Sequence, residues 1–392
     1  MRTVDLIQLA LALPAAASCT YLAVLTMLSQ RVPQPTPSER TLRFDVVVPA
    51  HNEAPVIERT VASLRRLDWP PDRFRVVVVA DNCTDATAAI ARAAGALVLE
   101  RRNPDLRGKG YALQFAFRTL ADQGWSAAVA VVDADTEVSP NLLEAFASRI
   151  QQGEDAIQAH YGILNPWASW RTQLITIAMA AFHIVRSRAR ERLGLSCGIR
   201  GNGWCLTHEV LGKVPYQAFS LAEDLEYGIE LGLAGYRVAY ADEAHADGEM
   251  VSSERVARQQ RQRWEGGRFS LIGSRLGPLL STAIKRRSAV CLDLALDLLV
   301  LPLSYVTLNV ATLVILAAIL DWNTRAPGPW LWIGIACSGA LGLHVLRGWQ
   351  LSGLGPRGAL ALARVPVYLA WKLVLLAYRK PQAWVRTERE KP

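Results

Sequence analysis

Two acidic residues, Asp133 and Asp135, follow an apolar run that begins at Ala127. A short continuous apolar run is typical of a strand buried on both faces of a parallel sheet, and open α/β sheets bind ligands beyond the carboxyl ends of such strands. Carboxylate oxygens are the ligands that Mg²⁺ and Mn²⁺ prefer, commonly together with substrate phosphates. The Asp-x-Asp spacing therefore indicates a divalent-metal site, or else a plain polar turn after the strand.

A second acidic pair, Glu223 and Asp224, stands before a helical pattern that is expected to end at Gly235. Ser220 and Glu223 have the Ser-x-x-Glu spacing of a capping box, which would give Glu223 a purely structural role. Asp224 has two explanations at this point. It is an acid that the helix dipole favours in a first turn, or it is a catalytic carboxylate.

Lys109 lies between two glycines at the expected start of another helix. A Walker motif needs a glycine five residues before Gly108 and a Ser or Thr after Lys109, whereas Asn103 and Gly110 occupy those positions. A P-loop NTPase is therefore excluded. What remains is an anion site at a helix N-terminus, or a plain turn.

Arg263 and Trp264 belong to a strongly basic helical stretch, Arg255 to Arg268. Basic amphipathic segments beside membrane spans commonly face lipid headgroups. The alternative is that Arg263 binds a phosphate while Trp264 offers a flat face to a sugar ring.

The elements that must position these residues alternate between apolar runs and helical patterns from Phe44 to about Asp242. Such alternation is the signature of βαβ units, so we expect an α/β fold with a mostly parallel sheet and flanking helices. The predicted strands are Val46–Pro49, Arg75–Ala80, Leu97–Leu99 and Ala127–Asp135.

The composition indicates a membrane component, because 51% of the residues are hydrophobic. The net charge of +8 beside apolar spans indicates the cytoplasmic face of a membrane protein rather than nucleic-acid binding. The six cysteines are scattered without a zinc spacing and are expected to be reduced.

Three apolar stretches are long enough to cross a hydrocarbon core of about 30 Å: Leu6–Leu28, Leu298–Leu320 and Trp330–Leu346. The first also contains small residues that suit a signal peptide, but its apolar pattern continues beyond them, which favours an uncleaved helix. Residues 359–378 are interrupted by Arg364, Pro366 and Lys372, so we expect a re-entrant or interfacial segment there.

Six motifs occur in the order and approximate spacing of the family 2 glycosyltransferases. The motifs are Val48–Glu53, Asp81–Asp85, Gly108–Gly110, Asp133–Asp135, Glu223–Asp224 and Gln260-x-x-Arg263-Trp264. The chain resembles the membrane-integrated, processive-type branch that contains cellulose, chitin and hyaluronan synthases, the nodulation chitooligosaccharide synthase and ceramide glucosyltransferase. This resemblance implies a GT-A fold, a nucleotide-diphosphate-sugar donor that is usually a UDP-sugar, and inverting transfer to an acceptor hydroxyl.

For the donor side, the resemblance implies that Glu53, Asp81 and Lys109 bind the uridine, its ribose or its phosphates. Asp133 would face the nucleotide, and Asp135, together with Asp133, would bind the Mn²⁺ or Mg²⁺ that bridges the diphosphate. His245, near Asp247, is a further candidate ligand of this metal.

For the acceptor side, the resemblance implies that Asp224 is the general base. Arg263 would stabilise the leaving pyrophosphate on the donor, and Trp264 would form the floor of the acceptor site. The loop Gly201-Asn202-Gly203 would lie near the acceptor.

We expect six segments along the chain. We also expect the protein to lie in the inner (plasma) membrane with its catalytic domain in the cytoplasm. The segments are an N-terminal transmembrane helix (1–30), a proline-rich linker (31–42), a GT-A domain (43–250), basic interfacial helices (251–290), a transmembrane hairpin with an interfacial segment (291–378) and a basic cytoplasmic tail (379–392).

The acceptor is left open between two classes, with a growing polysaccharide or oligosaccharide favoured and a membrane lipid as the alternative. Three spans are few for a polymer channel in one chain, so polymer export would require a homodimer or a secretion partner. A non-catalytic membrane scaffold of a secretion system is the remote alternative. The intact Asp133, Asp135, Asp224 and Arg263 argue against it.

Overall fold

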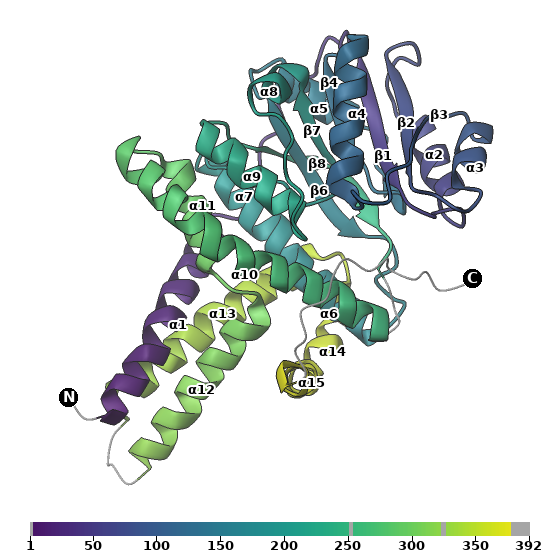
Figure 1. The fold of residues 1–392 in the computed structure, drawn as a ribbon. Helices are drawn as coiled ribbons and strands as arrows, with labels where there is room; N and C mark the ends of the chain where they lie inside the picture. The colour runs from purple at the N-terminus through teal and green to yellow at the C-terminus, as the bar shows by residue number, and fades with distance from the viewer. Residues whose placement is uncertain (1–2, 251–253, 323–326, 378–392) are drawn as a thin grey trace. The chain divides into compact units, whose positions relative to one another are not determined.

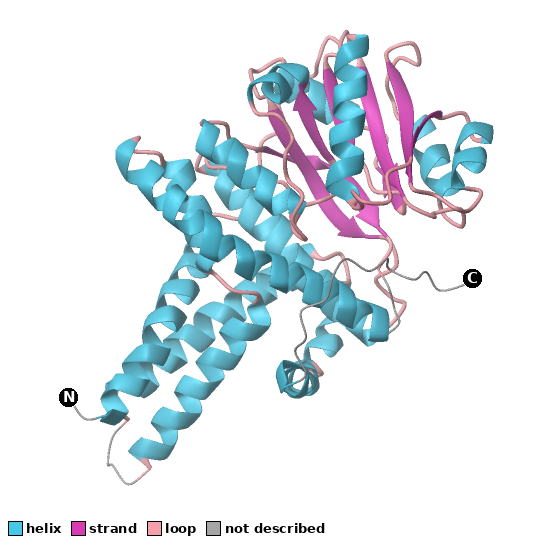
Figure 2. Cartoon of the chain, in the orientation of Figure 1, coloured by secondary structure: helices cyan, strands magenta, loops and turns pink. Residues whose placement is uncertain are grey.

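The computed structural model describes residues 3–250, 254–322 and 327–377 (Figures 1 and 2). These residues form two compact units, each built from segments that are distant in sequence. The sheet unit comprises residues 31–166, 191–250 and 254–295, and the helical unit comprises residues 3–30, 167–190, 296–322 and 327–377. Residues 167–190, which the sequence analysis places inside a contiguous 43–250 domain, belong to the helical unit.

The sheet unit contains one eight-stranded mixed sheet in the order β3-β2-β1-β4-β7-β6-β8-β5, drawn in magenta in Figure 2. Its strands are β1 Phe44–Ala50, β2 Phe74–Asp81, β3 Leu97–Arg101, β4 Ala128–Val131, β5 Thr136–Val138, β6 Ala156–Ile163, β7 Trp204–Thr207 and β8 Ala239–Gly248. Strands β3, β2, β1 and β4 run parallel, and so do β6 and β8, whereas β7 is antiparallel to both of its neighbours and β5 to β8. The expected α/β sheet with four early parallel strands is confirmed, and the second half of the sheet is mixed.

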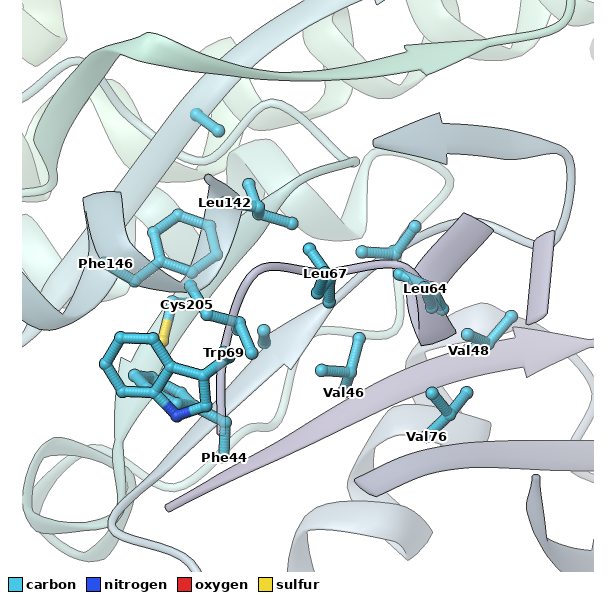
Figure 3. Packing of buried hydrophobic residues seen from close by; sticks show 14 of the residues in the cluster. Phe44, Val46, Val48, Leu64, Leu67, Trp69, Val76, Leu142, Phe146 and Cys205 are labelled. Atoms are coloured by element: carbon cyan, nitrogen blue, oxygen red, sulfur yellow. The ribbon is translucent and has the colours of Figure 1, made fainter. Parts of the chain in front are cut away.

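Both faces of the sheet are covered, because successive side chains of a strand point to opposite faces. Val46 and Val48 of β1 pack in one apolar cluster with Leu64 and Phe146, as Figure 3 shows. Val47 between them packs in a second cluster on the opposite face. This burial on both faces explains why the strands appear in the sequence as continuous apolar runs.

Seven helices of the sheet unit flank or follow the strands: α2 Ile57–Arg65, α3 Thr87–Ala93, α4 Lys109–Gln123, α5 Leu142–Ile150, α8 His208–Lys213, α9 Glu223–Ala234 and α10 Glu254–Lys285. Helices α2, α3 and α5 contribute to the cluster of Figure 3, and α4, α8 and α9 contribute to the cluster on the other face. The predicted basic stretch around Arg263 lies within the long helix α10.

The helical unit is built from α1 Thr3–Met27, α6 Trp170–Met179, the π-helical turn Ala180–Val185, α12 Leu303–Asp321, α13 Pro329–Leu351, α14 Gly355–Leu362 and α15 Val365–Ala377. Helices α7 Arg186–Arg192 and α11 Ala289–Leu299 continue across the boundary between the units.

Among the described residues, three helices are long and apolar enough to cross a membrane: Asp5–Met27, Leu303–Asp321 and Pro329–Leu351. Each overlaps one of the three predicted spans, but the second begins at Leu303 rather than at the predicted Leu298, because α11 ends at Leu299 and α12 starts only after Pro302. The remaining apolar region, predicted to lie at 359–378, forms the short helices α14 and α15, and its last residue lies outside the described part.

The three candidate spans pack directly on one another. Ala15 and Leu22 of α1, Leu313 of α12 and Leu341 of α13 belong to one buried apolar cluster. Side chains therefore fill the interior of this three-helix bundle.

Candidate functional site

Three acidic residues that the sequence singles out lie at one edge of the sheet. Glu53 follows β1, Asp81 ends β2 and Asp133 follows β4, and these three strands are parallel neighbours in the order β2-β1-β4. Because the carboxyl ends of parallel neighbours meet at the same edge, the fold brings the three residues to the position where open α/β sheets bind ligands.

A buried asparagine, Asn202, stabilises the turn that contains Asp133 and Asp135 through hydrogen bonds. The side-chain oxygen of Asn202 accepts a hydrogen bond from the backbone N–H of Asp133 at 3.0 Å, and its amide nitrogen donates to the Thr136 hydroxyl at 2.8 Å. Asn202 is fully buried. Its side chain therefore positions the acidic turn, and an acceptor role for the 201–203 loop stays a prediction.

Lys109 begins helix α4 and points its amine at the same turn. The Nζ atom donates to Asp133 Oδ1 at 2.5 Å and also to the backbone carbonyl of Gly201. Burial alone would lower the pKa of Lys109, but the negative charges of Asp133 and Glu223 outweigh it and raise that pKa above its usual value. The amine therefore stays charged and partly neutralises the acidic cluster.

The predicted capping box at Ser220 and Glu223 is wrong. Helix α9 begins at Glu223 after Ala222, with no side-chain cap, and the backbone N–H of Ser220 donates to Glu226 Oε2 at 3.0 Å instead. Glu223 is thus free of the structural role that its spacing suggested. Burial and the negative charge of Asp224 raise its pKa to about 7, although Lys109 and Arg263 act in the opposite direction.

Gly201 lies against the carboxylate of Asp224. Its φ of +87° is in the left-handed region, and a Cβ atom at this position would stand 3.0 Å from Asp224 Oδ2. The Gly201 carbonyl also accepts a hydrogen bond from the Lys109 amine. Gly201 therefore lies between Lys109 and Asp224, and a side chain at this position would push the Asp224 carboxylate by a few tenths of an ångström.

Tyr161, on β6, is a residue of this site that the sequence analysis missed. Burial, followed by the negative charges of Asp133, Asp135 and Asp224, raises its pKa well above the usual value. The phenol is therefore neutral, and it lies within electrostatic range of the three carboxylates. No local sequence signal marks Tyr161, because its place in the site comes from the pairing of β6 in the middle of the sheet.

Arg263 and Trp264 of α10 differ in their surroundings. The positive charge of Arg263 acts on both Tyr161 and Glu223, which places its guanidinium beside the acidic cluster. The Trp264 side chain is 40% exposed. The structure thus brings Arg263 to the site, whereas a sugar-binding role for Trp264 stays a prediction.

Asp81 is paired with an arginine that the sequence analysis also missed. Arg101 Nη1 donates to Asp81 Oδ1 at 2.6 Å, and both side chains are nearly buried. Arg101 is the partner of Asp81 in the β2–β3 register, so strand-end reasoning applied to β3 would have found it. On the other side of β2, the backbone N–H of Glu53 donates to the Thr87 hydroxyl at 2.8 Å.

The donor set at the acidic turn suits a hard divalent cation that the substrate helps to bind. Asp133, Asp135 and Asp224 concentrate negative charge around one phenol, and oxygen ligands are those that Mg²⁺ and Mn²⁺ take. The described residues contain no group of three or more His, Cys, Asp or Glu side chains arranged to hold a metal. His245 instead pairs with Asp247 at 2.7 Å. A cation here would need substrate phosphate oxygens besides the two aspartates of the turn.

Known proteins similar to this chain are glycosyltransferases. A probable glycosyltransferase, YdaM, of Bacillus subtilis is 24% identical over 234 residues, which are 57% of this chain and 55% of that protein. The β-monoglucosyldiacylglycerol synthase of Synechocystis is 29% identical over 233 residues, 57% of this chain and 47% of that protein. A probable glucomannan 4-β-mannosyltransferase of Oryza sativa is 26% identical over 242 residues, 57% of this chain and 40% of that protein. The chain spans about half the length of these relatives.

A solved structure shares the fold over most of the chain. The mannosyltransferase PcManGT of Pyrobaculum calidifontis, in complex with GDP-Man and Mn²⁺, matches with a TM-score of 0.52 at 19% identity, and the match covers 88% of this chain and 99% of that one. The sequence model of the family described as "Glycosyltransferase like family 2" matches residues 42–267, which contain every candidate site residue named above. The chain therefore belongs to the family 2 glycosyltransferases and has their GT-A fold.

Proposed function

We propose that this protein is an inverting, divalent-metal-dependent membrane glycosyltransferase that moves a sugar from a nucleotide-diphosphate donor to an acceptor hydroxyl. The observation that carries the proposal is the set of contacts that joins the acidic turn to Asp224. The Lys109 amine donates to Asp133 and to the Gly201 carbonyl, and Gly201 lies against the Asp224 carboxylate. These groups provide a place for an anionic donor and a separate carboxylate for the acceptor.

On the donor side, the nucleoside lies at the Glu53 and Asp81 end of the sheet edge, and the diphosphate lies at the acidic turn. Asp135, with Asp133, would hold Mn²⁺ or Mg²⁺, and the bound cation would supply Lewis-acid stabilisation to the leaving diphosphate. Lys109 and Arg263 add positive charge where the departing diphosphate gains negative charge. Preorganised charge of this kind is commonly the largest catalytic contribution.

On the acceptor side, Asp224 takes the proton of the attacking hydroxyl. The oxygen then bonds to the anomeric carbon as the bond from that carbon to the diphosphate breaks, which inverts the configuration. A single displacement needs one base, and one such base contributes about 10² to 10⁴ in rate. Gly201 lets the base stand close to the loop that faces the acceptor.

For the acceptor, the helical unit favours a membrane lipid over a growing polymer. The three candidate spans pack through Ala15, Leu22, Leu313 and Leu341, so apolar side chains of the described residues occupy the space between the spans where a polysaccharide would have to pass. The 29% identity to a glucosyldiacylglycerol synthase agrees with a lipid acceptor, whereas the 26% identity to a probable glucomannan mannosyltransferase agrees with the polymer alternative. We therefore propose transfer to a lipid hydroxyl at the cytoplasmic face of the inner membrane, and polymer synthesis as the alternative that requires further copies or a secretion partner.

The test is nucleoside diphosphate release by the purified full chain in lipid-containing detergent. UDP-sugars and GDP-sugars are supplied one at a time with Mn²⁺ or Mg²⁺, and the labelled product is partitioned between organic and aqueous phases. We expect metal-dependent release with one donor and a labelled product of single-sugar size in the organic phase. Labelled material of dispersed, larger size would instead support the polymer alternative.

Two variants and one control test the proposed roles of Asp224 and Asp135. Asp224→Asn should retain donor binding but lose transfer by at least about 10²-fold, since it removes the base. Asp135→Ala should lose metal-dependent donor binding. Asp122→Asn, on the exposed surface of α4, is the matched control and should behave like the wild type. Normal transfer by Asp224→Asn would refute the base assignment, and absence of donor binding in the wild type would favour the scaffold alternative.

A further inference from the structure

The segment that leads to the proposed base packs against two helices of the sheet unit. This base segment, residues 218–224, forms the start of helix α9 and ends at Asp224. Ala222, at the N-cap position of α9, has no side-chain atom that could cap the helix. The position of Asp224 therefore depends in part on the contacts that other elements make with the base segment.

Helix α4 makes the first of these contacts, one residue after Lys109. A Cβ atom at Gly110 would overlap the backbone carbonyl oxygen of Ala218, so only a glycine allows this approach. Next to it, the Tyr111 ring stacks on the Phe219 ring, with the centroids 4.3 Å apart and the planes at 11°. The base segment is thus held against the start of α4, where Lys109 lies.

Helix α10 makes the second contact, one helical turn after Arg263. A Cβ atom at Gly267 would stand 2.7 Å from the Cβ atom of Ala222 and 3.0 Å from its backbone nitrogen. Carbon atoms in contact are normally about 3.5 to 4.0 Å apart, so an alanine at position 267 would require a backbone movement of about 1 Å. Gly267 therefore lets α10 lie directly against the residue before α9.

An ion pair further along α10 joins the same two helices. Arg275 Nη2 lies 2.8 Å from Glu230 Oε1 and 3.5 Å from Glu226 Oε1, and both acids belong to α9. The other oxygen of Glu226 accepts the backbone N–H of Ser220, inside the base segment. Gly267 and Arg275 are about 12 Å apart along the helix, so together they fix the direction of α10 along α9 as well as its distance (Figure 1).

We propose that Gly110 and Gly267 are positioning residues, whose contacts hold Asp224 in a fixed relation to Lys109 and Arg263. This inference rests on the proposed function, in which Asp224 is the base and the two cations stabilise the diphosphate. In an inverting displacement the attacking hydroxyl and the departing diphosphate lie on opposite sides of the anomeric carbon. The base and the cations must therefore keep their separation during the reaction, and each glycine maintains it through the base segment.

The test compares Gly267→Ala with Gly266→Ala in the purified full chain. Gly266 is exposed on the same helix, and a Cβ atom there would meet no atom of the described residues within 4 Å. Gly267→Ala should lower the kcat of nucleoside diphosphate release at least about tenfold, because misplacing a reacting group by about 1 Å can cost about 10² in rate. Its metal-dependent donor affinity should change less than about twofold, since the contact acts on the transition state. Gly266→Ala should keep both values.

A compensating substitution distinguishes positioning from a general loss of structure. Ala222→Gly removes the methyl group that the new Cβ atom at position 267 would meet. The double variant Gly267→Ala/Ala222→Gly should therefore recover kcat at least about threefold over Gly267→Ala, although the contact with the backbone nitrogen remains. Ala222→Gly alone should stay within about twofold of the wild type.

A folded Gly267→Ala protein with wild-type kcat would overturn the proposal, and so would a loss of kcat that Ala222→Gly does not relieve. If Gly267→Ala does not fold, Arg275→Gln decides, because it loosens the same helix pair without adding atoms. Its kcat should fall about two- to fivefold, the range for an ion pair of this exposure, and an unchanged kcat would overturn the proposal.

Asp224→Asn, assayed alongside, separates this inference from the proposed function. Normal transfer by Asp224→Asn would refute the base and the inference with it. Loss of transfer in Asp224→Asn together with full activity of Gly267→Ala would reject the positioning role alone and leave the proposed function standing.

Discussion

Gly201→Ala should reduce transfer because the new methyl group would push on the proposed base. The added Cβ would stand 3.0 Å from Asp224 Oδ2, a contact so tight that the carboxylate has to move by a few tenths of an ångström. Misplacing a reacting group by about 1 Å can cost about 10² in rate. A shift of several tenths of an ångström should therefore lower kcat about tenfold.

The same substitution also strains the backbone, so its effect needs a control for stability. Gly201 has a φ of +87°, where an alanine costs roughly 1 to 2 kcal/mol. Gly235 ends the helix that carries Asp224, has a φ of +98° and has open space where a Cβ would lie. Gly235→Ala should therefore lower the free energy of unfolding by a similar amount without moving the base.

The assay measures nucleoside diphosphate release at saturating donor, with thermal unfolding of both variants in the same detergent. We expect similar losses of Tm, a drop of about tenfold in kcat for Gly201→Ala, and nearly unchanged kcat for Gly235→Ala. If the two variants retain equal activity, the close approach of Gly201 to Asp224 has no catalytic consequence and the placement of the base is refuted.

Two further predictions concern residues around the acidic turn. Because the pKa of Glu223 is raised to about 7, its carboxyl gains negative charge between pH 6 and 8. Donor affinity should fall about fivefold over that interval, which is the effect of one added negative charge ~8 Å from the donor diphosphate at an effective dielectric constant of ~40. In Glu223→Gln, donor affinity should be independent of pH. The carboxyl of Glu223 ionises near pH 4.5 in the unfolded chain and near 7 in the folded one, so wild-type stability should fall progressively between these values and level off above 7. The Tm advantage of Glu223→Gln should grow over the same interval, and a wild type whose donor affinity and Tm are independent of pH would contradict both predictions. Asn202→Ala leaves the Asp133 N–H and the Thr136 hydroxyl without their partner, so it should cost about 1 to 3 kcal/mol by chemical denaturation and weaken metal-dependent donor binding. Unchanged donor binding by a folded Asn202→Ala protein would show that the turn holds its shape without this side chain.

Elements with a strong local signal could be predicted from the amino-acid sequence. Strands such as Phe44–Ala50 appear as continuous apolar runs because both of their faces are buried, and the three candidate spans appear through length and hydropathy. The order of the six motifs identified the family. The position of Asp133 after a buried strand also indicated that it lies at the ligand-binding edge.

Contacts between side chains that are distant in sequence could not be predicted in the same way. The Ser220 spacing predicted a local cap for Glu223, but the backbone N–H of Ser220 turns to Glu226, and Glu223 joins the acidic cluster through tertiary contacts. Tyr161 carries no local signal, and although Arg101 stands at a strand end, only the pairing of β3 with β2 brings it to Asp81. Local patterns depend on neighbours along the chain, whereas the composition of the site depends on the register and order of a mixed sheet, which no short segment of sequence contains.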